Sequence, residues 1–117
     1  MLLAVGIVAA LATALPVAAN SVQSTTGGCT GVGHSYILTS SWSFTETDAS
    51  DFGGCGYVFS QGTFIIGGNA YQIGPGWGTG PLQGVDVFEN VSSVSGVHNL
   101  CNAGGPCGSS NPWGTSD

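Results

Sequence analysis

The chain has 117 residues with no Lys or Arg and 6 Asp or Glu, which gives a net charge of -6. A protein without cationic side chains cannot neutralise phosphates, so nucleic acid is excluded as a partner and anionic membrane surfaces are disfavoured. The length allows one domain with a modest core, and the largely uncharged surface offers little charge repulsion against self-association.

The first predicted element is the apolar block Met1–Ala19, which contains no charged residue. As a secretory signal it has an apolar region over Leu2–Leu15, a helix-breaking Pro16 and a small-residue ending, so cleavage is expected before Asn20. The cationic residues that normally precede such a region are missing. As a retained helix it is apolar all round and must be buried on every side, although it is short and interrupted for a membrane span. Cleaved signal, buried helix and membrane anchor all stay open.

The stretch LLAVGIVAALATALP resembles the N-terminal helix of type IV pilins, the archaeal ones in particular. The resemblance covers Met1–Pro16 and lacks the Phe-Thr-Leu-Ile-Glu start of bacterial pilins. It implies a homopolymeric extracellular filament, with a core helix over residues 1–24 and a head domain over residues 25–117. The side chains that would carry assembly are Leu2, Leu3, Val5, Ile7, Val8, Leu11 and Leu15.

The next segments predict a polar linker followed by a strand. Asn20–Thr30 is polar and loop-like, and a retained helix is expected to extend to about Ser24. His34–Thr45 is the clearest strand, because aromatic and aliphatic residues alternate with Ser and Thr. The larger residues on one face are Tyr36, Leu38, Trp42 and Phe44, and this face, with Trp42, is expected to point into the core.

Further along the chain, Glu46–Gly54 is predicted as an acidic, turn-rich loop and Tyr57–Ser60 as a short strand. Thr63–Ile66 and Ala70–Ile73 flank Gly67-Gly68-Asn69, which is a strong hairpin signal because glycine permits positive φ.

The C-terminal half begins with Gly74–Gly84, whose prolines and glycines predict an irregular loop. Val85–Phe88 and Val91–Val97 read as two strands around a turn near residues 89–90, and Asn99–Asp117 reads as a Gly/Ser/Pro tail. About six short strands without an amphipathic helix predict a mainly β fold, an antiparallel sandwich or open barrel.

Four cysteines in a small chain with an export-like leader predict two disulfides. Three connectivities are possible. Cys29–Cys55 and Cys101–Cys107 are preferred because each closes a local Gly-rich loop. The spacing does not match a zinc site, and no cofactor is expected.

Two groups of residues could carry chemistry. Glu46, Asp48 and Asp51 could hold calcium, but they lack EF-hand spacing and also read as a solvated turn. The side chains that could form an acid–base or metal set are His34, His98, Asp86 and Glu89. No nucleophile or metalloprotease motif accompanies them, so the chain is not expected to be an enzyme.

Two tryptophans and one asparagine are candidates for surface contacts. Trp77 and Trp113 lie in Gly/Pro-rich segments, where they could cover the domain's own core, contact another subunit or stack on a sugar. Asn90-Val91-Ser92 is an N-glycosylation pattern at a predicted turn.

The sequence leads to two hypotheses about function, both placing the protein outside the cell. The first is a structural subunit of a pilus-like filament, assembled through the apolar N-terminal helix with the β head exposed. The second is a secreted β-domain starting at Asn20, which acts as an adhesive or carbohydrate-binding module for cell-surface glycans. A filament built by strand exchange ranks below the helical one, because the Ala-rich leader makes a poor strand.

Overall fold

The computed structural model describes residues 20–26, 28–49, 55–102 and 112–117. Strands dominate these residues, as expected from the sequence. The strands are β1 (Ser21–Thr26), β2 (Cys29–Thr39), β3 (Trp42–Asp48), β4 (Cys55–Ile66), β5 (Asn69–Gly78), β6 (Leu82–Val87), β7 (Val91–Asn102) and β8 (Trp113–Ser116). Within the described residues, no helix has the length and apolarity needed to cross a membrane.

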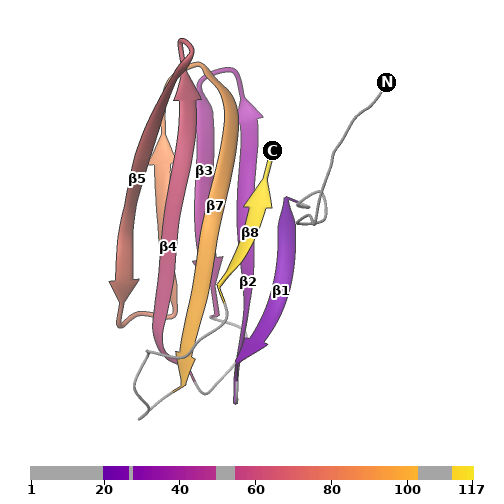
Figure 1. The fold of residues 1–117 in the computed structure, drawn as a ribbon, viewed down its shortest axis with the longest axis vertical. Helices are drawn as coiled ribbons and strands as arrows, with labels where there is room; N and C mark the ends of the chain where they lie inside the picture. The colour runs from indigo at the N-terminus through magenta and orange to yellow at the C-terminus, as the bar shows by residue number, and fades with distance from the viewer. Residues whose placement is uncertain (1–19, 27, 50–54, 103–111) are drawn as a thin grey trace.

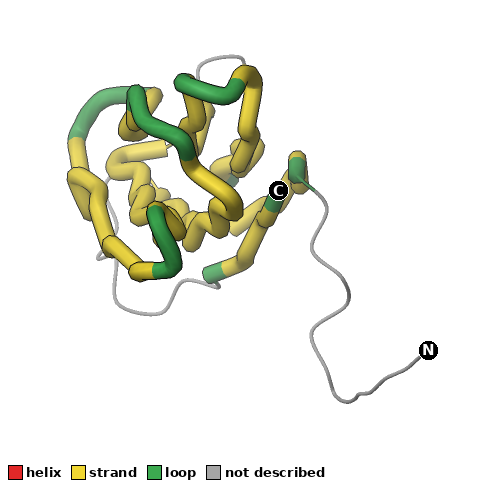
Figure 2. The backbone as a smooth tube through the Cα atoms, turned by 90° about the horizontal axis from the view of Figure 1, so that it is seen from above, coloured by secondary structure: helices red, strands yellow, loops and turns green. Residues whose placement is uncertain are grey.

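The strands form two four-stranded antiparallel sheets that face each other (Figure 1). Sheet A has the order β1-β2-β3-β6, and sheet B has the order β5-β4-β7-β8. Seen from above, the strands enclose the interior of the domain (Figure 2). The predicted antiparallel β architecture is therefore confirmed for the described part of the chain.

The hairpin between β4 and β5 matches the prediction closely. Ile66 pairs with Asn69, so the turn itself is Gly67-Gly68. Both glycines have positive φ, 59° and 81°, which is the conformation that side-chain-bearing residues avoid. Glycine at these two positions therefore fixes the register of the hairpin.

Several segments differ from the sequence prediction. The predicted strand His34–Thr45 is a hairpin, since β2 ends at Thr39 and β3 begins at Trp42. The segment expected to be a polar linker, or the end of a helix at Ser24, forms β1 instead, because pairing with β2 satisfies its backbone groups. Residues 46–48, placed in an acidic loop, continue β3, and residues 57–60 and 63–66 belong to one strand, β4.

The Gly/Pro-rich segment 74–84 was expected to be irregular, yet β5 continues to Gly78 and β6 begins at Leu82. β5 is an edge strand, where Pro75 is tolerated because one side of the strand needs no partner. A register shift between Ser60 and Gly62 and the positive φ of Gly76 absorb the irregularity. The predicted tail likewise contributes residues 99–102 to β7 and residues 113–116 to β8.

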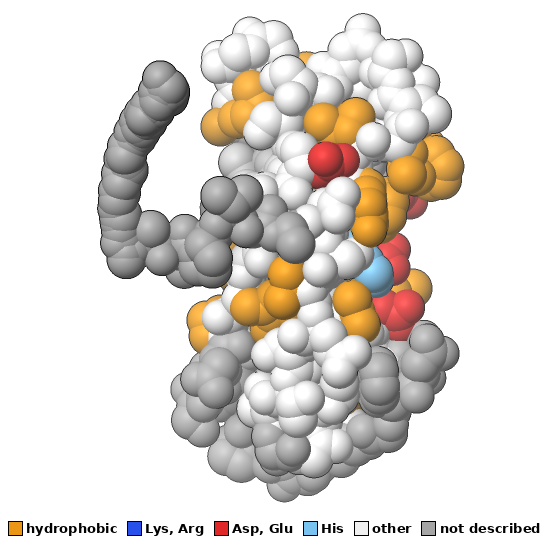
Figure 3. All heavy atoms as spheres, turned by 90° about the vertical axis from the view of Figure 1, so that its right-hand side faces the viewer, with side chains coloured by type: hydrophobic (Ala, Val, Ile, Leu, Met, Phe, Trp, Pro, Cys, Tyr) orange, Lys and Arg blue, Asp and Glu red, His pale blue; other side chains and the backbone are white. Residues whose placement is uncertain are grey.

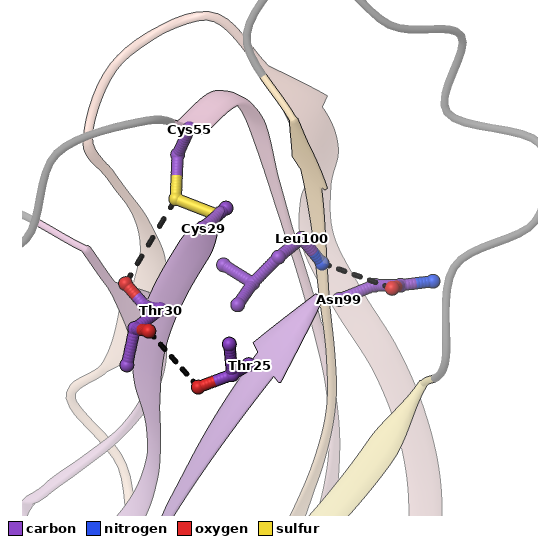
Figure 4. Close-up of a disulfide and its surroundings, with 6 residues drawn as sticks. All are labelled: Thr25, Cys29, Thr30, Cys55, Asn99 and Leu100. Carbon is purple, nitrogen blue, oxygen red and sulfur yellow. Dashed lines mark hydrogen bonds between the residues drawn. A yellow bond between two sulfur atoms is a disulfide. The ribbon is translucent and has the colours of Figure 1, made fainter. Parts of the chain in front are cut away.

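The Cys29–Cys55 disulfide is present as predicted, and it links β2 of sheet A to β4 of sheet B (Figure 4). Leu100 lies beside the disulfide, and Thr25 and Thr30 bond to each other 2.9 Å apart across β1 and β2. A sequence separation of 26 corresponds to about 3.5 kcal/mol in the chain-entropy model. The pairing of Cys101 with Cys107 remains a prediction, because Cys107 lies outside the described residues.

The interior of the sandwich has two apolar ends and a polar middle. One apolar cluster contains Cys29, Ala49, Val58 and Leu100, and the other contains Phe64, Val87, Val91 and Val94. Between them lie fully buried polar side chains, of which His98 is the largest. The other members of this polar layer are Ser35, Ser43, Thr45, Thr47, Ser60 and Thr115.

The polar layer reverses the predicted orientation of β2 and β3. Ser43, Thr45 and Thr47 are buried, whereas Trp42 keeps 39% of its surface exposed. The prediction that Trp42 lies in the core is therefore wrong. The physical reason is space: glycines line the inner face, and a Cβ at Gly62 would overlap Thr45 and Phe64. Small side chains of β2 and β3 fit there, and hydrogen bonds offset the cost of burying the hydroxyls of Ser35, Thr45 and Thr47.

Candidate functional site

The outer face of sheet A carries the aromatic residues that the sequence had assigned to the core. Residues that alternate with the buried Ser and Thr point away from the sandwich, because successive side chains in a strand take opposite faces. In the register of the sheet, Tyr36 lies opposite Phe44, and Phe44 lies opposite Asp86. His34 lies opposite Glu46 in the next row.

The rings on this face form a continuous row, called here the ring row: His34, Tyr36, Phe44, Trp42 and Phe88. Successive ring centroids are 6.0, 5.4, 6.4 and 6.2 Å apart. The last two rings, Trp42 and Phe88, stack with an interplanar angle of 16°. They keep 39% and 69% of their surface exposed, so this end of the ring row is the most accessible. Apolar ring surface is therefore available along sheet A without any movement of the chain.

The rings are bordered by carboxylates. Trp42 Nε1 donates a hydrogen bond of 3.3 Å to Asp86 Oδ1, which orients the indole on the sheet surface. Burial raises the pKa of Glu46, and the nearby Asp48 and Asp86 raise it further, while His34 opposes them. The face therefore combines flat rings with hydrogen-bond acceptors, and it has no cation.

The histidine end of the ring row is held by Ser21 of β1. Its Oγ lies 2.6 Å from His34 Nδ1 and 2.7 Å from the Tyr36 hydroxyl. Figure 3 shows a histidine side chain at the surface beside acidic side chains, with hydrophobic side chains above and below them. β1 thus holds the histidine end of the ring row, and the rings from His34 to Phe44 lie on β2 and β3.

The histidines and carboxylates do not come together as one acid–base or metal set. His34 and Asp86 lie on the outer face of sheet A, His98 is buried between the sheets, and Glu89 lies in the exposed turn after β6. Among the described residues, no group of three His, Cys, Asp or Glu is placed to hold a metal ion. For the calcium candidates, Glu46 and Asp48 are strand residues of β3, and Asp51 lies outside the described part.

The two tryptophans that were predicted in Gly/Pro-rich loops lie on strands and have different environments. Trp77 lies on β5, 40% exposed, with its ring edge-on to Phe59 at 5.3 Å on the outer face of sheet B. Trp113 is half-buried in β8, where its Nε1 donates to the Val22 carbonyl at 3.1 Å and its ring lies 5.6 Å from that of His98. Trp77 is therefore available for contacts, whereas Trp113 covers the domain's own interior.

The remaining predicted sites have mixed outcomes. Asn90 is exposed in the turn between β6 and β7, as glycosylation requires, and Ser92 Oγ bonds to the Ile65 carbonyl at 3.3 Å. The apolar residues expected to carry assembly, from Leu2 to Leu15, lie outside the described part of the chain.

Sequence reasoning missed Tyr36, Phe44 and Phe88 as surface residues. A usable signal was present: Gly31 and Gly33 are in phase with Ser35 along β2, and glycine in a strand marks a close approach of other atoms. The positions in phase with these glycines lie on the inner face of the sheet. The aromatic residues, which alternate with them, therefore lie on the outer face.

The chain matches no protein-family model, no curated protein and no solved structure.

Proposed function

We propose that the protein is an extracellular β-sandwich module that binds neutral polysaccharide along the ring row of sheet A. The observation that carries the proposal is the row itself, five rings in succession bordered by Asp86 and Glu46. Sugar rings present apolar faces that stack on aromatic planes and hydroxyls that donate to carboxylates.

Charge selects among the possible ligands. The chain has no Lys or Arg, and acidic side chains border the ring row, so an anionic polymer would be repelled. A neutral polymer meets no such penalty and supplies the donors that the carboxylates accept. The disulfide between the sheets supports an oxidising compartment, as expected for a protein outside the cell.

The test is a binding titration with cellohexaose, chitohexaose and mannohexaose, with polygalacturonate as the anionic comparison. We expect at least one neutral oligosaccharide to bind and polygalacturonate to fail. Phe88→Ala and Trp42→Ala should each weaken binding about tenfold, corresponding to about 1.5 kcal/mol for one lost stacking contact. Phe88 is 69% exposed, so its removal leaves the core intact.

The matched control is Trp77→Ala, which removes an equally exposed tryptophan from the opposite sheet. Under the proposal it leaves the affinity unchanged. If Trp77→Ala abolishes binding and Phe88→Ala does not, the ligand lies on sheet B instead. If none of the three oligosaccharides binds, the proposal is wrong.

A second candidate function is a subunit of a pilus-like homopolymer, supported by one observation at the N-terminus. The apolar block ends at Ala19, and the edge strand β1 begins at Ser21, so the block joins the sandwich without a spacer. In this proposal, copies of the apolar block pack together and the sandwich faces outward. Ile7→Asp should then abolish filaments seen by electron microscopy, and wild-type-like filaments from this variant would exclude the helical assembly.

A further inference from the structure

A chain of hydrogen-bonding contacts crosses the interior of the sandwich at His98, whose side chain has no exposed surface. Its Nδ1 lies 2.7 Å from Thr47 Oγ1 of sheet A, and its Nε2 lies 2.7 Å from Thr115 Oγ1 of β8. Thr47 Oγ1 in turn lies 2.6 Å from the carbonyl oxygen of Phe59. One end of the chain of contacts is therefore a backbone acceptor on β4.

The other end also reaches a backbone acceptor. Thr115 Oγ1 lies 2.6 Å from Ser35 Oγ, and Ser35 Oγ lies 3.0 Å from Thr45 Oγ1. Thr45 Oγ1 lies 3.0 Å from the carbonyl oxygen of His34. Six contacts thus connect the carbonyls of His34 and Phe59, through four hydroxyls and one imidazole.

The protons available to this chain of contacts can be counted. Each of the four hydroxyls supplies one proton, and a neutral imidazole supplies one more, so five protons serve six contacts. Because carbonyls only accept, neither neutral tautomer of His98 can fill every contact. The imidazolium supplies a sixth proton, and then each contact carries one: Nδ1–H donates toward Phe59 through Thr47, and Nε2–H donates toward His34 through Thr115, Ser35 and Thr45.

We propose that His98 is a built-in proton acceptor, which takes up one proton in acid inside the closed sandwich and completes the chain of hydrogen bonds. In the neutral tautomer with the proton on Nδ1, the Thr115 hydroxyl donates to Nε2. The added proton comes from water and binds Nε2. The Thr115 hydroxyl then turns to donate to Ser35, and the Ser35 hydroxyl turns to donate to Thr45. No bond between heavy atoms breaks, and no hydrogen bond of the chain is lost. The proposal does not depend on what the ring row binds.

The packing around the chain of contacts holds its members in place. A Cβ at Gly33 would overlap the ring of His98, and a Cβ at Gly96 would overlap the hydroxyls of Thr45 and Ser35. Glycine at these two positions makes room for the polar layer and fixes its spacing. The heavy atoms therefore already lie at hydrogen-bonding distance, and only the hydroxyl protons need to turn.

The charged and titratable groups around His98 are few. β2 contributes His34 and Tyr36, which lie on the outer face of sheet A. The carboxylates of β3, Glu46 and Asp48, lie on that same outer face. β4 contributes only Tyr57 on its outer face, β1 and β8 contribute none, and Asp117 after β8 accepts from the Ile37 amide. Burial lowers the pKa of His98 to about 4, and His34 adds to the effect. His98 therefore takes up a proton only under acidic conditions.

The test is NMR of the ring nitrogens in protein labelled with ¹⁵N-histidine, followed from pH 7 to pH 3 beside the amide spectrum. We expect the two His98 nitrogens to differ at pH 7 and both to become protonated near pH 4, while the amide spectrum keeps its folded dispersion. If His98 becomes protonated only as the folded spectrum disappears, the proposal is overturned.

Two variants on the inner face of β3 separate the chain of contacts from general burial. Thr45→Val removes the link to the His34 carbonyl. When His98 is protonated in this variant, the Ser35 hydroxyl has no acceptor for its proton. The pKa of His98 should therefore fall by about one unit, which is a tenfold loss of proton affinity. Ser43→Ala is the matched control, because the Ser43 hydroxyl is buried without a partner in the described residues. Equal His98 pKa values in the two variants would overturn the proposal, and Ser35→Ala gives the same test if Thr45→Val does not fold.

Discussion

The stability of the sandwich should fall as the pH drops from about 6.5 to about 4, because of His98. Burial lowers the pKa of this histidine from 6.5 to about 4 in the folded protein, so the unfolded chain binds a proton more readily in that window. The free energy of unfolding is therefore highest above pH 6.5, decreases between pH 6.5 and pH 4, and levels off below pH 4. A difference of about 2.5 pKa units corresponds to about 3 kcal/mol.

Glu46 acts in the opposite direction and must be removed to see this effect alone. Burial raises the pKa of Glu46, so the folded protein holds that proton more strongly than the unfolded chain. Acidification through its titration range therefore stabilises the fold. Glu46 is half-buried on the outer face of sheet A, so Glu46→Gln removes the opposing contribution and leaves the interior unchanged.

The assay is urea unfolding of Glu46→Gln, followed by circular dichroism at half-unit steps from pH 7 to pH 3.5. With a constant m-value, the unfolding midpoint should fall between pH 6.5 and pH 4, and the extrapolated free energy should drop by about 3 kcal/mol. A midpoint that does not change across this window would refute the reasoning, because a buried neutral histidine must produce the slope.

Three further predictions concern stability in urea at pH 7. Replacing both Cys29 and Cys55 by Ala should cost about 3.5 kcal/mol, from the 26-residue separation that the disulfide closes, and a cost near zero would contradict the inter-sheet link. Gly33→Ala should lower the free energy of unfolding by about 1–3 kcal/mol, because its Cβ would overlap the His98 ring. Gly28→Ala is the control and should change stability little, because its Cβ meets nothing within 4 Å. Equal effects of the two variants would be inconsistent with the packing. Ser60→Ala should stabilise the fold by about 1 kcal/mol, because the Ser60 hydroxyl is buried without a partner in the described residues, and a loss of stability would show that the hydroxyl is bonded.

The β character of the chain and one disulfide could be predicted because they depend on local features. The Gly67-Gly68 turn is fixed by positive φ, and the two strands it joins follow from alternation on either side. The Cys29–Cys55 pairing was preferred because it closes a local loop, and the structure confirms it as a link between the sheets.

The orientation of β2 and β3 could not be predicted from alternation alone. Alternation shows which residues share a face, but which face is buried depends on the space between the sheets. Here Gly62 and Gly96, on strands far along the chain, pack so closely against sheet A that a Cβ at either glycine would overlap Thr45. The space there admits the small side chains of Ser35 and Thr45. The aromatic rings consequently lie outside, and the ring row became recognisable only when the register of three strands was known.

The Gly/Pro-rich segment 74–84 was mispredicted for a related reason. Proline and glycine argue against a central strand, but they are compatible with an edge strand. The position of β5 at the edge of sheet B is a property of the whole topology, which no window of sequence contains. The polar interior could not be predicted either. The hydrogen-bonding partners of His98 lie on β3 and β8, and only the folded topology brings these strands together with β7.

The measurement that tests the central claim most directly is an NMR titration of the folded protein with the oligosaccharide that binds best among the three hexaoses. The ring row predicts that the shifted signals are those of Tyr36, Trp42, Phe44 and Phe88, with the Trp42 indole N–H among the largest changes because it bonds to Asp86. The signals of Phe59 and Trp77 on sheet B should stay in place. Shifts confined to sheet B, or none on the ring row at saturation, would contradict the account.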